Sequence, residues 1–221
     1  MSKKHEPESE QPGDQSTGQT PGIVFIVDDD EALRDSLRWL IESVGLRVET
    51  HDSAASFLQS YYPGQSGCLL LDVRMPGMSG LELQEQLERR DVRIPVVIIT
   101  GHGDVAMAVR AMKAGAMDFI EKPFDDELLL ASIQRALSLD VEQRKSRATQ
   151  AEILARMAQL TRREHQVMEL VTNGKANKQI AAELNVSAKT VEAHRAHVME
   201  KMQAGSLAEL VRMSMLASGD G

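Results

Sequence analysis

The chain has 221 residues, with 33 acidic and 25 basic side chains and a formal net charge of −8 at pH 7. That length suffices for two ordinary domains. No stretch approaches about 18 consecutive apolar residues, which excludes a predicted membrane-spanning helix.

The polar residues 1–20 lack the apolar core of a secretory signal, and we expect residues 1–21 to form a disordered tail. The single Cys68 cannot form an internal disulfide and suits a reducing, cytoplasmic environment.

Charge is divided unevenly along the chain. Through Leu137 there are 23 acidic and 13 basic residues, whereas from Ser138 onward there are 10 acidic and 12 basic residues. The acidic first part suits a cation site, and the small basic excess of the second part permits nucleic-acid binding without demonstrating it.

Short apolar runs alternate with helical patterns from Gly22 to about Leu139. We expect strands at residues 23–27, 46–49, 68–71, 95–99 and 118–120. We expect helices at residues 33–44, 53–60, 80–90, 104–114 and 125–139. Five such βα units predict a doubly wound α/β domain over residues 22–139, with a parallel five-stranded sheet covered on both faces.

Polar side chains stand where four of these strands end. Asp28 and Asp29 close the first apolar run, Asp72 the third and Thr100 the fourth, and Lys122 follows the fifth. Because the carboxyl ends of parallel strands meet at one edge of a sheet, these side chains should converge there. Each alone is an ordinary surface residue, but together they predict a site for a hard cation and a phosphoryl group.

The region after the fifth strand has helical character only. No Gly or Pro occurs between Phe124 and Asn173, so a helix can continue past Leu139, and we expect a helical linker over residues 140–157. Residues 161–164 (Thr-Arg-Arg-Glu) then form a capping-box pattern that opens a new helix.

Residues 158–221 predict an all-α domain of four helices. A short helix around Ile180, a tight turn at Asn185 and a longer helix capped by Ser187 give a helix-turn-helix layout over about residues 177–196. From the pattern alone, a generic four-helix bundle without a ligand is an equally good interpretation.

Two ordered sets of motifs resemble known families. The strand-end residues, with Lys122-Pro123, resemble the receiver domain of response regulators, for which the resemblance implies the strand order 2-1-3-4-5. The second part resembles the LuxR-type helix-turn-helix domain. The residues that carry this second resemblance are Leu160-Thr161-Arg162-Arg163-Glu164, Asn177-Lys178-Gln179-Ile180-Ala181, Leu184-Asn185-Val186-Ser187 and Lys189-Thr190-Val191-Glu192-Ala193-His194. Together, over about residues 23–213, they are similar to the NarL/FixJ class of two-component response regulators.

The resemblance implies the chemistry of the acid cluster. Asp72 would accept a phosphoryl group from the phosphohistidine of a sensor histidine kinase. Asp29, Asp72 and the backbone carbonyl of Arg74 would bind Mg²⁺, and Asp28 would act directly or through water. Arg74 and His102 are expected to rim the acyl phosphate and to modulate its lifetime.

The resemblance also implies a switch. Lys122, with a cis bond to Pro123, would pair with the new phosphoryl charge, and the Thr100 hydroxyl would donate to it. Phe119 would follow Thr100 inward, and the face formed by residues 104–114, 118–121 and 125–139 would then form a homodimer.

The longer helix of the second domain should enter the major groove. Val191 is predicted to face the core and Glu192, Arg195 and Ala196 to face outward. Arg195 could then read guanine and Glu192 could accept from cytosine, although a solvated Glu192 is an equally good interpretation. Further contacts, mainly to phosphates, are expected from Lys178, Lys189, Thr190, His194 and Lys201. His194 and His197 form an H-x-x-H pair, but no third ligand is evident, so we expect no metal there.

These expectations favour a transcription regulator that is switched by Mg²⁺-dependent phosphorylation, dimerises, binds promoter DNA and acts on RNA polymerase. It would not be a conventional enzyme. The rivals are a phosphatase acting on an external substrate and an atypical regulator that needs no phosphorylation. The sequence argues against the first because no separate acid/base pair is evident, and the complete acid cluster argues against the second.

Overall fold

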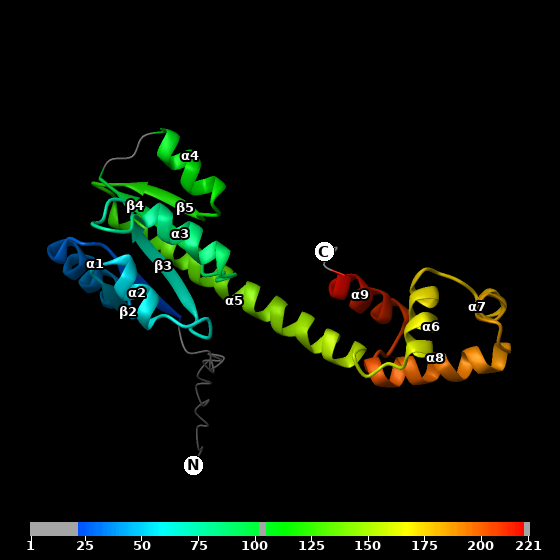
Figure 1. Ribbon diagram of the computed structural model, residues 1–221. Coiled ribbons are helices and arrows are strands. Elements are labelled where there is room, and N and C mark those ends of the chain that lie inside the picture. Colours follow the sequence, from blue (N-terminus) through cyan, green and yellow to red (C-terminus); the bar gives the residue numbers. More distant parts are fainter. Residues whose placement is uncertain (1–21, 102–104, 219–221) are drawn as a thin grey trace, which may run out of the picture. The chain divides into compact units, whose positions relative to one another are not determined.

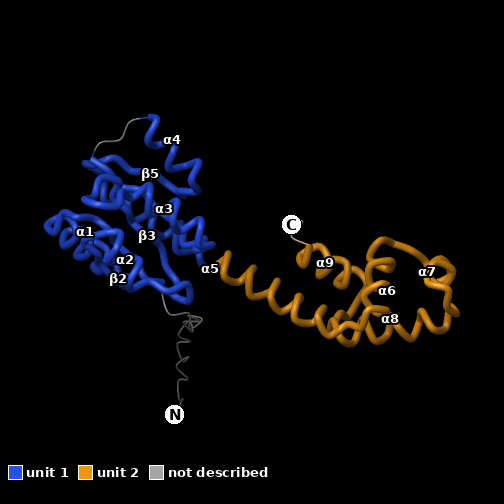
Figure 2. Tube along the Cα trace, in the orientation of Figure 1, with its two compact units in different colours: residues 1–140 blue, residues 141–221 orange. Residues whose placement is uncertain are grey.

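The computed structural model describes residues 22–101 and 105–218 (Figure 1). The chain divides into two compact units, one ending at Asp140 and one beginning at Val141 (Figure 2). Within the described residues, no helix combines the length and the apolar character needed to cross a membrane.

Unit 1 alternates strands and helices. Its strands are β1 (Ile23–Val27), β2 (Arg47–His51), β3 (Gly67–Asp72), β4 (Val96–Thr100) and β5 (Asp118–Glu121). Its helices are α1 (Glu31–Ser43), α2 (Ala54–Ser60), α3 (Gly80–Arg89), α4 (Val105–Lys113) and the beginning of α5 (Asp126–Met157). The strand β2 begins and ends later than the expected 46–49, because Gly45 and Leu46 still belong to the turn after α1.

The five strands form one sheet in the order β2-β1-β3-β4-β5, and every described pair is parallel. The expected fold and strand order are therefore confirmed. The strands β1 and β3 are neighbours at the centre of the sheet. After β1 the chain continues to β2 on one side, and after β3 it continues to β4 on the other side. This is the switch point at which open α/β sheets bind ligands.

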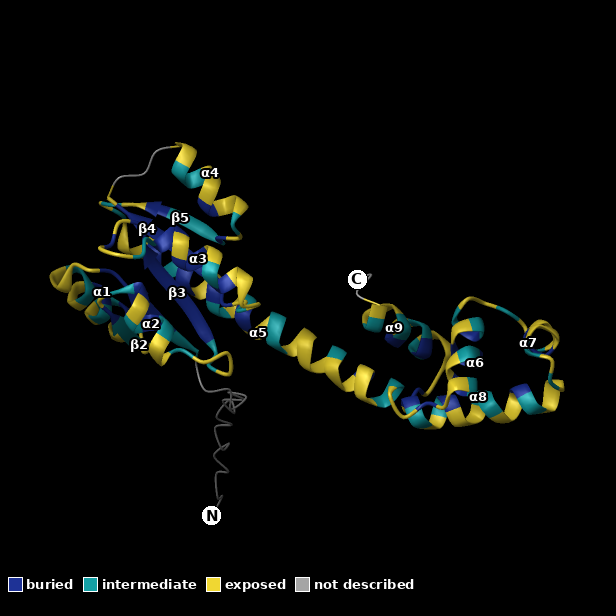
Figure 3. Cartoon of the chain, in the orientation of Figure 1, coloured by how far each residue is buried: buried dark blue, intermediate teal, exposed yellow. Residues whose placement is uncertain are grey.

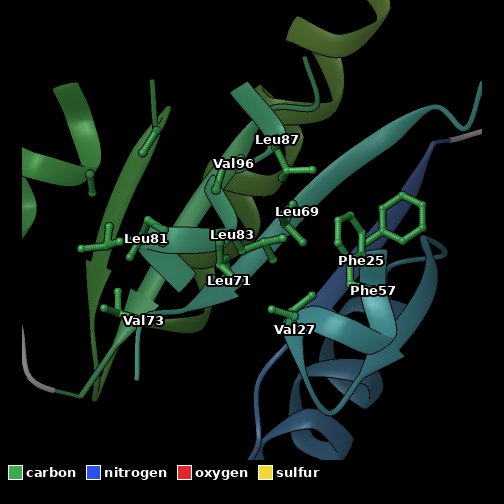
Figure 4. Close-up of a cluster of buried hydrophobic side chains, with 14 of the residues drawn as sticks. Phe25, Val27, Phe57, Leu69, Leu71, Val73, Leu81, Leu83, Leu87 and Val96 are labelled. Carbon is green, nitrogen blue, oxygen red and sulfur yellow. The ribbon is translucent and has the colours of Figure 1, made fainter. Parts of the chain in front are cut away.

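Alternation along the strands divides the core between the two faces of the sheet. Phe25 and Leu69 belong to the cluster that α2 and α3 cover (Figure 4), whereas Ile26 and Leu70 belong to the cluster that α1 and α5 cover. All of β3 is buried, as Figure 3 shows. A strand buried on both faces reads as a continuous apolar run, which is the pattern that the sequence shows there.

Unit 2 is entirely helical among its described residues. It contains the end of α5, α6 (Arg162–Thr172), α7 (Asn177–Leu184), α8 (Ala188–Met202) and α9 (Leu207–Ser218). The capping box predicted at Thr161 and Glu164 is present. Helix α5 runs without a break through the residues expected to form a linker, and Ile153 near its end packs into the core of unit 2.

Candidate functional site

The acid cluster of unit 1 is held together by one lysine. Asp28 follows β1 and Asp72 ends β3, so the two carboxylates stand on neighbouring strands. The Lys122 Nζ donates to Asp28 Oδ2 at 2.8 Å and to Asp72 Oδ1 at 2.7 Å. The sequence prediction that these strand ends converge is therefore met for these three residues, which we call the acid pocket.

Asp72 is 5 % exposed, and both of its oxygens have donors. Its Oδ2 accepts from the backbone N–H of Arg74 at 2.7 Å, while Oδ1 takes the Lys122 ammonium. Burial raises the pKa of Asp72, and the hydrogen bond and charge of Lys122 oppose that rise. Burial also lowers the pKa of Lys122, but its hydrogen bonds to Asp28 and Asp72 outweigh the burial, so that the pKa is raised overall. The lysine remains charged between two carboxylates.

The backbone after Asp72 approaches the next helix closely. A Cβ placed on Gly80 would lie 2.1 Å from the Asp72 carbonyl oxygen. Glycine has no Cβ and therefore fits here without a clash. The Gly80 N–H donates to the carbonyl of Val73 at 3.0 Å, which closes the turn. Gly77 within this turn has a φ of 79°, in the left-handed region. These contacts fix the position of Asp72 and Arg74.

The other predicted receiver residues have distinct environments. Asp29 is exposed beside the acid pocket, and Arg74 is exposed on the turn after Asp72. Thr100 is 1 % exposed, and its carbonyl accepts from the Lys122 N–H at 2.8 Å. Phe119 is half-buried against the cluster that α2 and α3 cover.

Two further predictions concern the neighbouring loops. The peptide bond between Lys122 and Pro123 is cis, as the sequence led us to expect. His102, expected at the rim of the site, lies outside the described residues.

The predicted groove-binding helix is α8. Val191 is fully buried, as predicted, and Glu192 and Ala196 are exposed. Lys178 on α7 and Lys189 on α8 are exposed as well. Thr190 and His194 are half-buried, and Thr190 stands at the capped start of α8, where its N–H donates to Ser187 Oγ at 3.0 Å.

Arg195, predicted to face outward, is only half-exposed and has a partner within unit 2. It lies four residues after Val191, one helical turn along the helix. Its side chain donates to Asn177 Oδ1 at 2.6 Å and lines a small apolar pocket with Val167 and Leu210. Arg195 thus connects α8 to the start of α7, and its contact with guanine stays a prediction.

Lys201 also has a structural partner. Its Nζ donates to Glu164 Oε2 at 2.7 Å, and Glu164 is only 4 % exposed. The hydrogen bond from Lys201 and that from the Thr161 backbone lower the pKa of Glu164 to about 2. The ammonium expected to contact a phosphate is therefore committed to a contact between α8 and α6.

Glu164 stands near two histidines in a way that the sequence did not reveal. Ligand atoms of Glu164, His194 and His197 lie within 4.8 Å of one another. The sequence showed the H-x-x-H pair on α8, but the third group comes from a helix about thirty residues earlier. Its only sequence signal was the capping box, which indicates a helix start and not a ligand.

Comparison with known proteins gives matches to both units. The family described as "Response regulator receiver domain" matches residues 24–134, and "Bacterial regulatory proteins, luxR family" matches residues 158–214. The transcriptional regulatory protein FixJ of Azorhizobium caulinodans is 51 % identical over 194 residues, which are 88 % of this chain and 92 % of the relative. Nodulation protein W of Bradyrhizobium diazoefficiens is 48 % identical over 91 % of this chain and 89 % of the relative.

Two solved structures are similar over nearly their whole length. The response regulator StyR has a TM-score of 0.78 and 49 % identity, covering 88 % of this chain and 98 % of that one. Full-length FixJ from B. japonicum has a TM-score of 0.55 and 48 % identity, covering 91 % of this chain and 99 % of that one.

Proposed function

Because this chain belongs to the two-component response regulators of the FixJ type, we propose that Asp72 is its phosphoacceptor and that phosphorylation controls DNA binding by unit 2. The chain combines a receiver domain with a LuxR-type DNA-binding domain and acts in transcription regulation. The observation that carries the proposal is the acid pocket, in which one ammonium contacts Asp28 and Asp72 at 2.8 and 2.7 Å.

Asp72 has the properties of a nucleophile towards phosphorus. A carboxylate oxygen can attack phosphohistidine, forming an O–P bond as the P–N bond of the kinase histidine breaks. Hydrogen bonds from Lys122 and from the Arg74 N–H hold the Asp72 carboxyl group in one orientation. After transfer, the Lys122 ammonium can remain paired with a phosphoryl oxygen, so the added negative charge has a counter-charge already in place.

The acid pocket and its neighbours Asp29 and Arg74 offer oxygen donors that suit Mg²⁺. Asp28, Asp29 and Asp72 would provide carboxylate oxygens and Arg74 a backbone carbonyl, and such hard oxygen donors are the ligands that Mg²⁺ prefers. The ion would neutralise the carboxylates and the phosphoryl group that collect there. Burial raises the pKa of Asp72, and the positive charge of a bound ion would oppose that rise and favour the reactive, ionised form.

The switch would run through Thr100 and Phe119. Phe119 pairs with Ile98 across β4 and β5, two residues before Thr100 on β4, so a movement of Thr100 acts on the strand that carries Phe119. Phe119 has no hydroxyl and needs no hydrogen-bond partner when it turns inward.

The surface next to this switch would form the homodimer. Its apolar side chains are Val105, Val109 and Met112 on α4 and Leu128 on α5, of which Val105 is 82 % exposed. We propose that the kinase-phosphorylated dimer binds promoter DNA and acts there on RNA polymerase.

DNA contacts would come from the exposed residues of α7 and α8. Glu192 and Ala196 would contact base edges and Lys178 and Lys189 would contact phosphates, and all four residues are exposed. Thr190 and His194 are the half-buried residues at the edge of this surface.

The phosphoacceptor is tested by labelling the full-length chain with acetyl phosphate and Mg²⁺. Asp72→Asn should abolish the label, whereas the control Asp30→Asn should keep it. Asp30 is the exposed N-cap of α1, and asparagine caps helices as well as aspartate does. Labelling of Asp72→Asn at the wild-type level would remove Asp72 from the role. Rapid hydrolysis of added phosphomonoesters by the wild type would instead support a phosphatase.

The DNA surface is tested by titrating cognate and random duplexes. Lys178→Ala should weaken both to a similar extent and reduce the salt slope by about 1. Lys145→Ala, an exposed lysine on the part of α5 in unit 2, is the matched control and should change neither. Equal losses in both variants would show that overall charge, and not the α7–α8 surface, produces the binding.

A further inference from the structure

Unit 2 holds a group of three ligand-type side chains, of which the DNA-binding proposal uses only His194. Glu164 on α6 and His194 and His197 on α8 each offer one ligand atom, and these atoms lie within 4.8 Å of one another. We propose that these three residues bind one divalent transition metal ion of the Zn²⁺ type and so tie α6 to α8.

The geometry is close to that of a bound site. The two histidines stand three positions apart on one helix and therefore share a face. Zinc ligands at about 2.0–2.2 Å from the ion stand roughly 3.4 Å from each other. His197 Nδ1 is already 3.6 Å from Glu164 Oε1. The His197 side chain is 58 % exposed, so its ring has space to turn towards an ion that enters from solvent, and His194 beside it is half-buried.

The two oxygens of Glu164 are used differently. Its Oε2 accepts from the Thr161 N–H at 2.8 Å and from Lys201 Nζ at 2.7 Å. Its Oε1 faces His197 instead. Hydrogen bonds to the outer oxygen of a ligating carboxylate orient it for a metal and keep it ionised. The charge of Lys201 is thus held on the oxygen that does not face the histidines.

The contact between His197 and Glu164 is too long for a hydrogen bond, at 3.6 Å from Nδ1 to Oε1. It is an ion pair when His197 is protonated, whereas a neutral His197 leaves its ring nitrogen available to a metal ion. A metal ion bound between His197 Nδ1 and Glu164 Oε1 would lie about 2 Å from each atom, which fits their separation.

The donor types set the class of ion. Two imidazole nitrogens and one carboxylate oxygen suit Zn²⁺, Cu²⁺ and Ni²⁺, and three protein ligands with an open fourth position are a common zinc arrangement. The acid pocket of unit 1 offers only oxygen donors and suits Mg²⁺. Excess Mg²⁺ can therefore saturate the acid pocket while the histidine site is titrated.

The test uses the untagged full-length chain in excess Mg²⁺. Zn²⁺ affinity is measured by competition with a chromophoric chelator, and Co²⁺ serves as a spectroscopic substitute. We expect one Zn²⁺ per chain and the strong visible absorption of tetrahedral Co²⁺ in the wild type. His194→Ala and His197→Ala should each weaken Zn²⁺ binding at least about tenfold and remove the Co²⁺ absorption.

His165→Ala is the matched control, because His165 is an exposed histidine of the same unit that stands next to Glu164 on α6. It should bind Zn²⁺ as the wild type does. Circular dichroism checks that each variant is folded. His197→Ala should fold as the wild type does, because the His197 side chain is largely exposed. The proposal is overturned if the wild type binds no Zn²⁺ under these conditions, if either α8 variant keeps wild-type affinity, or if His165→Ala loses binding equally. None of these readings depends on phosphorylation of Asp72 or on DNA.

Discussion

Replacement of Lys122 by methionine tests whether the acid pocket depends on one ammonium for its stability. Methionine keeps most of the length of the side chain and removes its charge. In the protein, Lys122 Nζ is 2.8 Å from Asp28 Oδ2 and 2.7 Å from Asp72 Oδ1, so those two oxygens are at most about 5.5 Å apart. Both carboxylates are buried, at 1 % and 5 % exposure. The variant therefore leaves two like charges close together without their shared partner.

The size of the effect follows from these distances. Two unit charges about 5.5 Å apart repel by about 3 kcal/mol at an effective dielectric constant of about 20. Removing one member of a buried ion pair costs roughly 3–5 kcal/mol. Protonation of one carboxyl group relieves part of this, so we expect the free energy of unfolding of unit 1 to fall by about 2–4 kcal/mol at pH 7 without divalent ions.

The loss should depend on pH and on Mg²⁺. Burial raises the pKa of Asp72 and Lys122 opposes that rise, so without Lys122 the pKa of Asp72 in the folded state lies further above its unfolded value. The resulting penalty exists at neutral pH and disappears as the pH falls below the unfolded value of about 3.9. Added Mg²⁺ should stabilise the variant more than the wild type, because the ion then takes the place of the missing ammonium at the two carboxylates.

Urea titration followed by near-ultraviolet circular dichroism measures unit 1 alone, since every aromatic residue of the chain lies between Phe25 and Phe124. Lys113→Met, at an exposed lysine on α4, is the control and should leave the urea midpoint unchanged. Equal stability of Lys122→Met and the wild type at pH 7 in chelator would refute the reasoning.

Three other substitutions probe buried groups. Burial lowers the pKa of His51, so the fold favours its neutral form; the urea midpoint of unit 1 should fall as the pH drops below about 6.5, and His51→Phe should flatten that dependence. Gly80→Ala should destabilise unit 1 by about 2 kcal/mol or more and slow acetyl phosphate labelling, because its Cβ would stand 2.1 Å from the Asp72 carbonyl oxygen. Glu164→Gln should destabilise unit 2 at pH 7, as measured by amide hydrogen exchange. The ionised Glu164 contributes its full stabilisation to the free energy of unfolding at pH values above the unfolded pKa of about 4.3. The difference from the wild type should therefore shrink as the pH falls towards the folded value of about 2.

The strands and the acid pocket could be predicted because their signals are local. The strands β1, β3 and β4 are short apolar runs, and the polar residue that closes each run marks its carboxyl end. Once the strands are parallel, Asp28, Asp72 and Lys122 must stand at the same edge, whatever the details of side-chain packing. Their shared hydrogen bonds follow from that placement and not from any neighbouring residues in the sequence.

The sequence is least informative where a side chain's partner lies on another helix. Counting outward from Glu192 placed Arg195 on the exposed side, but counting from the buried Val191 places it one turn along the inner face. Its hydrogen bond to Asn177 depends on how α7 packs against α8, which no local pattern states. Lys201 and the position of Glu164 beside the two histidines are missed for the same reason, since both depend on the packing of α6 against α8.

The contrast between Asp72 and Glu164 separates a reactive carboxylate from a structural one. Both are nearly buried and both accept a hydrogen bond from a lysine at 2.7 Å. Burial outweighs the other effects at Asp72 and raises its pKa, whereas Lys201 and the Thr161 backbone lower the pKa of Glu164. The ionised form of Asp72 is therefore destabilised by the fold, while that of Glu164 stabilises unit 2. A cation bound beside Asp72 would offset the cost of burying its charge, as Lys122 already does in part. Glu164 has no such cost left to offset, and this difference fits a reactive role for Asp72 and a structural role for Glu164.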